Sequence, residues 1–298
     1  MASRRPAEQL SVAELEPFWF GIDKERHFFT YHRCAGCGLL YNRTFFSEAQ
    51  LGELYAAMPP NMDQVPDDAI IATQRGYFAA AAAREVFAGD YLEIGPDVGH
   101  LVGEAARAGT FQRFWLFEPN HAVHPRLRDA LGSANGQILP SMTDLSAVPD
   151  GVVGLAVMVH VLDHLLDPSA MLTEIRAKLR PGGTLMIVTH DERSALSRML
   201  GPKWPAFCLQ HPELYNPVTI QRLLTNTGFA SVEVKRSTNH FPIDFLARQL
   251  SQAAGMRALG QLPLPRRSIG LRLGNMLTFA RTPDQAAVER RSRLESAA

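Results

Sequence analysis

The sequence predicts an α/β fold in which a mostly parallel sheet carries helices on both faces. The first observation is a short apolar run at 91–94, which leads into a glycine turn and an Ala-rich helical stretch. The second is an apolar run at 114–117 that ends on Glu118. The third is a fully apolar run at 155–159, followed by a helical stretch and a further apolar run at 184–189. Strands that alternate with helices in this way are typical of right-handed parallel units.

The chain divides into three predicted parts. Residues 1–80 form an N-terminal appendage with helices near 48–55 and 67–83, and residues 81–190 form the core of the sheet. Residues 191–298 open with a long stretch, 191–217, in which we predict no strand. After it we expect a helix at 218–228, a strand at 231–236, a helical insert at 244–260, a last strand at 275–280 and a polar tail at 281–298.

The turn after the first strand has the chemistry of a nucleoside site. Gly95 and Gly99 let the backbone approach a ligand closely, and the helix that follows presents free N–H groups to an anionic group. Glu118, at the tip of the neighbouring strand, is suited to accept two hydrogen bonds from a ribose diol. The pattern therefore predicts a ligand that contains a nucleoside.

The segment 93–99, Glu-Ile-Gly-Pro-Asp-Val-Gly, resembles motif I of the class I S-adenosylmethionine-dependent methyltransferases, with Asp97 in place of the middle glycine. The run from His160 to Pro168 is similar to one that follows the fourth strand in many of these enzymes, and so is Leu-Arg-Pro-Gly-Gly at 179–183. This resemblance implies a Rossmann-like sheet of seven strands with an antiparallel last strand, and S-adenosylmethionine as the cofactor.

The same resemblance implies which residues line the cofactor. The glycine turn surrounds the methionine and ribose ends, the residues after 114–117 meet the ribose, a later loop flanks the adenine, and the residues after 155–159 touch the cofactor through backbone atoms. In that order, the residues are Glu93, Gly95, Asp97 and Gly99; Glu118 and Pro119; Met142 and Thr143; and His160 and Val161.

Methyl transfer to an oxygen needs a group that takes the proton of the acceptor. We expect His211 to be this general base, with His164 and Asp191 as alternatives, because the stretch at 210–217 looks like a variant of a His-Leu-Tyr element that covers the site in related enzymes. The other reading of His211 is packing against the helix that follows. Further candidates stand after the third and fourth apolar runs, where ligands bind in such sheets: His160, Asp163 and His190.

Cys34 and Cys37 resemble the second knuckle of a zinc ribbon that precedes some bacterial methyltransferase domains. The first cysteine pair is missing, and aromatic residues stand near its place, at 18–20. Structural zinc needs four nitrogen or sulfur ligands, and His27 and His32 do not have the spacing of a knuckle. We therefore expect a degenerate ribbon held by aromatic packing, and no metal ligands in the chain.

The composition narrows the class of protein. The 298 residues carry no net charge and 46% of them are hydrophobic, which fits a chain with a large core. Nucleic acid is disfavoured as a partner, and no apolar run is long enough to span a membrane. We predict a cytoplasmic methyltransferase that acts on a small molecule in specialised metabolism, with its oligomeric state open. The alternative is a non-catalytic binding or scaffold protein that retains the fold.

Overall fold

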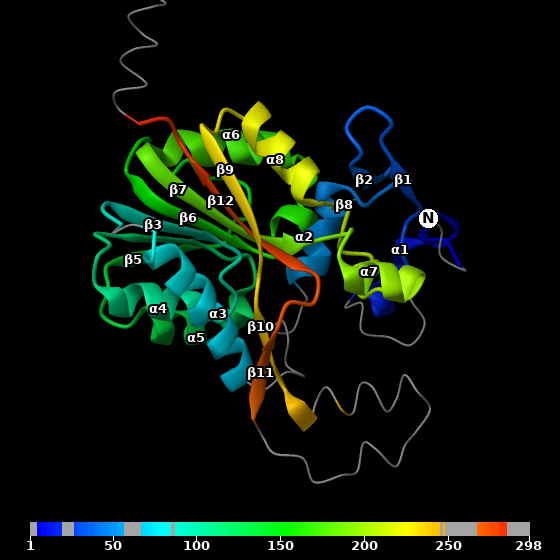
Figure 1. The fold of residues 1–298 in the computed structure, drawn as a ribbon, viewed down its shortest axis with the longest axis horizontal. Helices are drawn as coiled ribbons and strands as arrows, with labels where there is room; N and C mark the ends of the chain where they lie inside the picture. Colours follow the sequence, from blue (N-terminus) through cyan, green and yellow to red (C-terminus); the bar gives the residue numbers. More distant parts are fainter. Residues whose placement is uncertain are drawn as a thin grey trace, which may run out of the picture.

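The computed structural model describes residues 5–19, 27–56, 67–84, 87–244, 247 and 267–284, and its centre is a seven-stranded sheet (Figure 1). In spatial order the strands are β5 (Gly136–Leu139), β4 (Phe114–Phe117), β3 (Asp90–Ile94), β6 (Val153–Val159), β7 (Leu179–His190), β12 (Asn275–Arg281) and β9 (Ser231–Arg236). The first five are parallel, whereas β12 is antiparallel to both of its neighbours. The predicted Rossmann-like sheet with an antiparallel last strand is confirmed.

Helices cover both faces of this sheet (Figure 1). Because alternate side chains of a strand point to opposite faces, β3 contributes to two cores. Tyr91 packs with one group of helices, and Leu92 and Ile94 pack with the other. The first group is α3 (Asp67–Ala82), α4 (His100–Ala108) and α5 (His124–Leu131), and the second is α6 (Pro168–Lys178) and α8 (Pro217–Asn226).

The N-terminal appendage and the segment after β7 share one small sheet. β1 (Tyr31–Arg33) and β2 (Leu40–Asn42) form a hairpin, and β2 also pairs with β8 (Glu213–Leu214). The Arg33 guanidinium forms two hydrogen bonds of 3.0 Å to the Glu192 carboxylate, which is almost completely buried. The appendage therefore holds the segment that follows β7 by backbone pairing and by an ion pair.

The remaining elements are short. The helices are α1 (Val12–Leu15), α2 (Glu48–Ala56) and α7 (Ala195–Leu200), and β10 (Asn239–Pro242) pairs with β11 (Ser268–Leu271) in a hairpin. Single 3-10 turns occur at Ala7–Gln9, Glu16–Phe18, His121–Val123, Leu162–His164 and Gly201–Lys203.

The structure corrects the sequence-based expectations at several strands. β8 lies in the stretch where we predicted no strand, and its two residues form a strand because β2 is there to pair with them. β7 begins at Leu179 rather than at 184, because Leu179 pairs with Val153 before the register shifts around the glycines that follow. β5, β10 and β11 were not predicted. The predicted helical insert at 244–260 lies almost entirely outside the described residues, as does the predicted tail from 285 onward.

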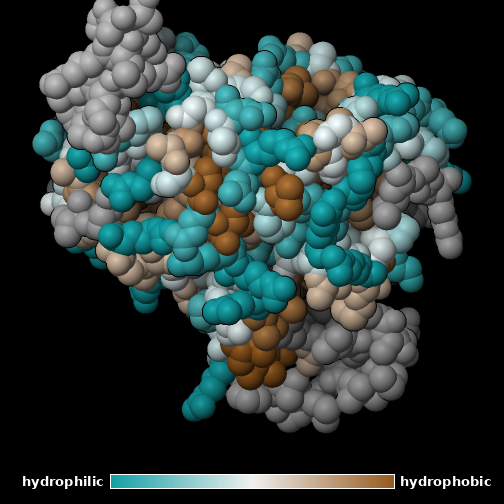
Figure 2. Space-filling view, turned by 45° about the horizontal axis from the view of Figure 1, so that its top comes forward, coloured by the Kyte–Doolittle hydropathy of each residue, from teal (hydrophilic) through white to brown (hydrophobic). Residues whose placement is uncertain are grey.

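The surface is mixed. The face in Figure 2 is mainly hydrophilic, with hydrophobic patches of limited extent. The most exposed large hydrophobic side chains among the described residues come from separate elements: Leu166, Met199, Val218, Ile269 and Leu273. Within the part of the chain that the structure describes, no helix is long and apolar enough to cross a membrane.

The turn between β1 and β2 is closed by its own backbone. The Cys34 N–H donates to the Leu39 carbonyl and the Gly38 N–H donates to the Cys34 carbonyl, both at 2.9 Å. The two cysteines are free thiols and only partly buried. These two hydrogen bonds close the turn. The ribbon-like origin of the segment stays a prediction.

Aromatic packing fixes the rest of the appendage. Trp19 is buried and meets the rings of Phe46 and Tyr55 edge-on, with centroids 5.6 and 5.2 Å apart. Phe18 packs against His27 at 4.1 Å. Phe20, the third aromatic residue of the predicted packing, lies outside the described residues.

We predict that the double substitution Cys34→Ser with Cys37→Ser leaves the melting temperature within a few degrees of the parent, because backbone hydrogen bonds close this turn. Thermal unfolding monitored by circular dichroism, together with elemental analysis of the purified proteins, provides the measurement. A loss of about one equivalent of zinc in the double variant, with a large fall in melting temperature, contradicts the prediction.

Candidate functional site

The glycine turn after β3 has left-handed backbone at three positions. The φ angles are 66° at Gly95, 50° at Asp97 and 81° at Gly99. Asp is among the few residues with a side chain that tolerate this conformation, so the turn keeps its shape although Asp97 replaces the expected glycine. Gly99 is also the N-cap of α4, whose first N–H groups point out of the turn.

Two close contacts explain why glycine stands at the ends of the turn. A Cβ atom at Gly95 would lie 2.7 Å from the side chain of Val161, and one at Gly99 would lie 2.6 Å from that of Leu127. Val161 is thus packed against the turn from the loop after β6. The structure brings this predicted residue to the glycine turn.

Glu118 lies under the same turn. Its carboxylate accepts hydrogen bonds from the backbone N–H of Asp97 at 2.9 Å and of Asn120 at 2.8 Å. The residue is 6% exposed, and burial raises the pKa of its carboxyl group. Glu118 therefore ties the glycine turn to the end of β4, a role that sequence reasoning did not identify. Pro119, beside it, is half-buried.

Glu93 is inside the molecule rather than on the surface of the turn. Its carboxylate accepts a hydrogen bond of 2.6 Å from the Tyr91 hydroxyl. Burial, opposed by this hydrogen bond and reinforced by the charge of Glu118, raises the pKa of Glu93 to about 8. The other predicted cofactor residues, Met142 and Thr143, follow β5 beside β4, where Met142 is half-buried and Thr143 is exposed.

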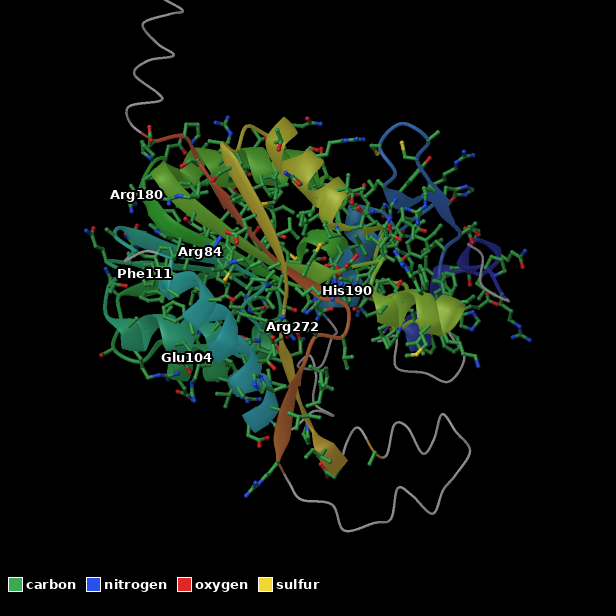
Figure 3. The ribbon with its side chains drawn as sticks, in the orientation of Figure 1. Arg84, Glu104, Phe111, Arg180, His190 and Arg272 are labelled. Atoms are coloured by element: carbon green, nitrogen blue, oxygen red, sulfur yellow. The ribbon has the colours of Figure 1, made fainter. Side chains whose placement is uncertain are left out.

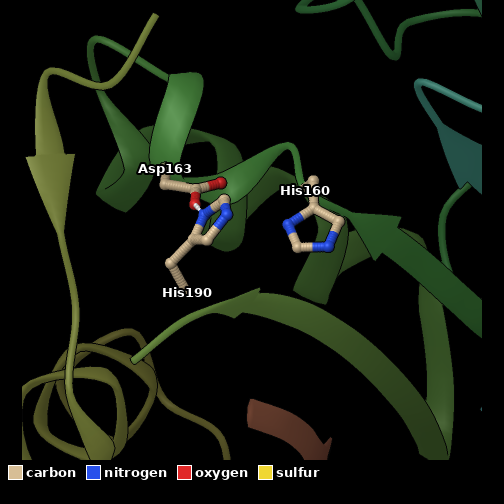
Figure 4. Close-up of side chains that lie close together, drawn as sticks. All are labelled: His160, Asp163 and His190. Carbon is tan, nitrogen blue, oxygen red and sulfur yellow. Dashed lines mark hydrogen bonds and ion pairs between the residues drawn. The ribbon is translucent and has the colours of Figure 1, made fainter. Parts of the chain in front are cut away.

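Four imidazoles surround one buried carboxylate beyond the carboxyl ends of β6 and β7. We call this group the imidazole cluster. Figure 4 shows three of its members, and Figure 3 labels His190 at the end of β7. The members are His160, Asp163, His164, His190 and His211.

Local structure delivers these side chains from three segments. His160 directly follows β6 and has a left-handed φ of 53°, and the turn Leu162–His164 then carries Asp163 and His164. His190 is the last residue of β7, and His211 lies two residues before β8. Residues other than glycine that adopt a left-handed backbone conformation are typical of functional sites.

Asp163 is the centre of the imidazole cluster. It has no solvent exposure, and its Oδ2 lies 2.6 Å from His190 Nδ1 and 3.9 Å from His211 Nε2. Its Oδ1 lies 4.0 Å from His164 Nε2. The rings of His160 and His190 have centroids 4.7 Å apart. The carboxylate thus faces three imidazoles at close range.

The pKa values of Asp163 and His211 are both shifted toward their charged forms. Burial raises the pKa of Asp163, but the facing imidazoles of His211, His190 and His164 outweigh it and hold the pKa well below its usual range. Burial alone lowers the pKa of His211, whereas Cys208, Asp163 and the Ala206 carbonyl together raise it to about 10. Burial, with the charge of a neighbouring imidazole, lowers the pKa of both His160 and His164 to about 3.

His211 is held at both ring nitrogens and at its backbone. Its Nδ1 is 2.7 Å from the Ala206 carbonyl, and its Nε2 is 3.1 Å from His164 Nε2. The Tyr31 hydroxyl and the Asn42 side-chain amide donate to the His211 carbonyl at 2.7 and 3.0 Å. A protonated His211 has no lone pair for an acceptor proton, so a base role requires it to lose its Nε2 proton first.

The other two predicted catalytic residues, His164 and Asp191, lie in different surroundings. His164 lies inside the imidazole cluster, and its Nδ1 is hydrogen-bonded to the Tyr55 hydroxyl at 2.7 Å. Asp191 lies outside it, where its carboxylate accepts from the Arg193 N–H, and burial raises the pKa of this carboxyl group. His190, a further candidate from the sequence, has a side chain that is 22% exposed, compared with 10% for that of His164.

Sequence reasoning missed the central position of Asp163 and the involvement of Tyr55. One signal was available, since Asp163 and His190 both follow neighbouring parallel strands, and the carboxyl ends of such strands meet at one edge. No signal linked Tyr55 or His211 to them, because the contacts join segments that are far apart in the sequence.

The raised pKa of Glu93 makes a prediction about stability without ligand. Below about pH 4.3 this carboxyl group is protonated in both the folded and the unfolded chain, so its contribution to stability is fully present there. The contribution is lost as the pH rises to about 8, on the order of 4 kcal/mol. Glu93→Gln keeps an acceptor for Tyr91 and is expected to flatten this dependence.

Urea unfolding of the ligand-free proteins between pH 5 and pH 8 measures the effect. The exposed Glu53→Gln serves as the control and should follow the parent. Parallel pH dependences for Glu93→Gln and the parent would show that Glu93 does not carry this linkage.

Comparison with known proteins agrees with the fold. A sequence model of a family described as a methyltransferase domain matches residues 71–234, which is more than half of the chain. No curated protein matches the sequence. All of the similar solved structures described below are less than 25% identical to the chain, so they bear on its fold alone.

One is a protein of Haloferax volcanii, named as a methyltransferase and solved with a methyltransferase activator. It is 16% identical, with 73% of this chain and 93% of that chain covered and a TM-score of 0.54. The N-methyltransferase NodS of Bradyrhizobium japonicum, solved with S-adenosyl-L-homocysteine, is 15% identical, with 79% and 98% covered and a TM-score of 0.49.

The family match covers the strands β3, β4, β6 and β7, the glycine turn and the imidazole cluster. Methyltransferase domains of this fold take their methyl group from S-adenosylmethionine, which is therefore the cofactor. The chain belongs to the methyltransferase domain family.

Proposed function

We propose that the chain transfers the methyl group of S-adenosylmethionine to a small-molecule acceptor. In this reaction a nucleophile of the acceptor attacks the methyl carbon in line, the carbon–sulfur bond breaks, and S-adenosylhomocysteine leaves. The protein aligns the three reacting atoms and takes a proton where the acceptor carries one. The single observation that carries the proposal is the imidazole cluster, which stands at the same edge of the sheet as the glycine turn.

The cofactor residues expected from the sequence support one binding path along that edge. They follow four adjacent strands in the order β5, β4, β3 and β6, at the ends where ligands bind in parallel sheets. The path runs from the adenine at Met142 and Thr143, past the ribose at Glu118 and Pro119, to the methionine group at the glycine turn, and ends at His160 and Val161. We propose that the carboxylate of Asp97 attracts the ammonium group of the methionine moiety.

The pair of His190 and Asp163 has the arrangement of a general base and the carboxylate that orients it. Asp163 Oδ2 is 2.6 Å from Nδ1, and this bond leaves Nε2 as the nitrogen that takes a proton. No hydrogen bond of Nε2 is found among the described residues, and the ring is partly exposed. We propose His190 for the proton transfer beside His211, His164 and Asp191, which the sequence suggested.

The charge of the chain supports a small-molecule acceptor. The chain has no net charge, which is unlike the basic surface that binds nucleic acid. A small metabolite taken up near the buried imidazoles fits these features better. We further propose that the enzyme works in the cytoplasm in a biosynthetic pathway of specialised metabolism.

Incubation with S-adenosylmethionine labelled in its methyl group tests the proposed function. Fractionated small-molecule extracts provide the acceptors, and mass spectrometry locates the labelled product. Transfer of label to a compound of low molecular mass, in step with the release of S-adenosylhomocysteine, is the expected result. The alternative is a scaffold protein that retains the fold, and Asp97 in place of a motif glycine is the reason to consider it. Cofactor binding without release of S-adenosylhomocysteine in any fraction favours this alternative.

Glu118→Ala is expected to weaken S-adenosylmethionine binding by about 1.5–3 kcal/mol, because a hydrogen bond to a charged group is lost. Glu118→Gln, which keeps one acceptor oxygen, should lose less. Isothermal titration calorimetry gives both affinities, and circular dichroism checks that each variant is folded. An affinity of the folded Ala variant equal to that of the parent refutes contact between Glu118 and the ribose.

Removal of the base is expected to lower turnover of a hydroxyl acceptor by about 10²- to 10⁴-fold while cofactor affinity stays nearly constant. We predict this fall for His190→Ala, and His211→Ala, His164→Ala and Asp191→Ala compare the sequence-based choices in the same assay. The exposed His121→Ala controls for the loss of an imidazole elsewhere. A change of less than about threefold in a folded variant excludes that residue as the base.

A further inference from the structure

Three potential ligand atoms converge inside the imidazole cluster. The Nε2 atoms of His164 and His211 are 3.1 Å apart, Asp163 Oδ1 lies 4.0 Å from the first, and Asp163 Oδ2 lies 3.9 Å from the second. One ligand atom from each of the three side chains lies within 4.8 Å of the other two. In a tetrahedral zinc site with bonds of about 2.1 Å, two ligand atoms are about 3.4 Å apart. The observed separations lie on both sides of this value, so small side-chain rotations would bring all three atoms to bonding distance.

The far side of each potential ligand is already fixed by a hydrogen bond. His164 Nδ1 is 2.7 Å from the Tyr55 hydroxyl, and His211 Nδ1 is 2.7 Å from the Ala206 carbonyl. The other carboxylate oxygen of Asp163 is 2.6 Å from His190 Nδ1. Partners of this kind set the tautomer and the orientation of ligands in metal sites, and an ion bound here takes the place of the Nε2 proton of His211.

One buried oxygen in this group has no partner. Asp163 is fully buried, and its Oδ1 makes no hydrogen bond among the described residues. A buried carboxylate oxygen without a partner costs free energy, since the water it had in the unfolded chain is not replaced. This oxygen is the one that faces His164 Nε2, at 4.0 Å. A cation between them would supply the missing interaction.

We infer that Asp163, His164 and His211 bind one divalent ion of a first-row transition metal, such as zinc, cobalt, nickel or iron. Imidazole nitrogens suit these ions, whereas magnesium and calcium prefer a shell of oxygens. The two overlapping groups that bring ligand atoms within 4.8 Å of one another, among the described residues, share Asp163 and leave out Cys34 and Cys37. This site differs from our sequence-based expectation that the chain has no metal ligands.

Three protein ligands leave a coordination position open, as in catalytic zinc sites. The partly exposed His190 marks the side from which a ligand could reach it. If the proposed methyl transfer is correct, an oxygen or nitrogen of the acceptor is the chemical class that fits this position, and this one statement rests on the proposed function. Binding of the ion itself does not depend on methyl transfer, so the two can fail separately.

Titration of the metal-free full chain with cobalt(II), without cofactor or acceptor, tests the inference. We expect one equivalent to bind, with visible absorption bands of a cobalt–imidazole site and a rise in melting temperature, because an ion that binds the folded chain stabilises it. Asp163→Asn and His211→Ala should abolish the bands. Tyr55→Phe, which removes only the hydroxyl that orients His164, should weaken cobalt affinity by about 10- to 100-fold.

The controls separate this site from other nitrogen and sulfur ligands. His121→Ala and the double variant Cys34→Ser with Cys37→Ser should keep one equivalent and the same absorption bands. Excess magnesium should not displace the cobalt. The inference is overturned if the metal-free parent takes up no cobalt, if folded His211→Ala binds it as the parent does, or if the cysteine double variant alone loses it.

Discussion

The buried carboxylate of Asp163 is the constraint on which the site depends. A buried charge needs partners close to it. The partners of Asp163 are His190 at the end of β7, His164 in the turn after β6, and His211 before β8. Because the partners come from three separate segments, their positions are fixed relative to one another. The pKa of His211 is raised to about 10, so its protonated form balances the charge of Asp163. The side chain of His190 is partly exposed.

The N-terminal appendage supports this arrangement from outside. β2 pairs with β8, which begins two residues after His211, and the Tyr31 hydroxyl and Asn42 amide donate to the carbonyl of His211. Tyr55, also from the appendage, reaches His164. The appendage and the segment 191–217, which are far apart in the sequence, are therefore joined by backbone pairing and by side-chain hydrogen bonds. Substitutions in the appendage that remove these contacts should therefore alter the positions of side chains in the imidazole cluster.

The central strands of the sheet could be predicted because each is indicated by a pattern of neighbouring residues in the sequence. The apolar runs of β3, β4 and β6 and the glycine turn with its acid are each visible within a few residues. β5 was missed because it is a partly exposed edge strand, and the two residues of β8 form a strand only through β2. The imidazole cluster could not be assembled from the sequence, because nothing local indicates that His211 and Tyr55 meet His164.

The account as a whole rests on a cofactor held by the glycine turn and presented to the imidazole cluster. Calorimetric titration of the purified chain with S-adenosylmethionine tests this most directly. The account predicts one binding site per chain with a dissociation constant on the order of micromolar, and competition by S-adenosylhomocysteine at the same site. The absence of any binding by a folded, ligand-free protein, at concentrations well above that range, would contradict it.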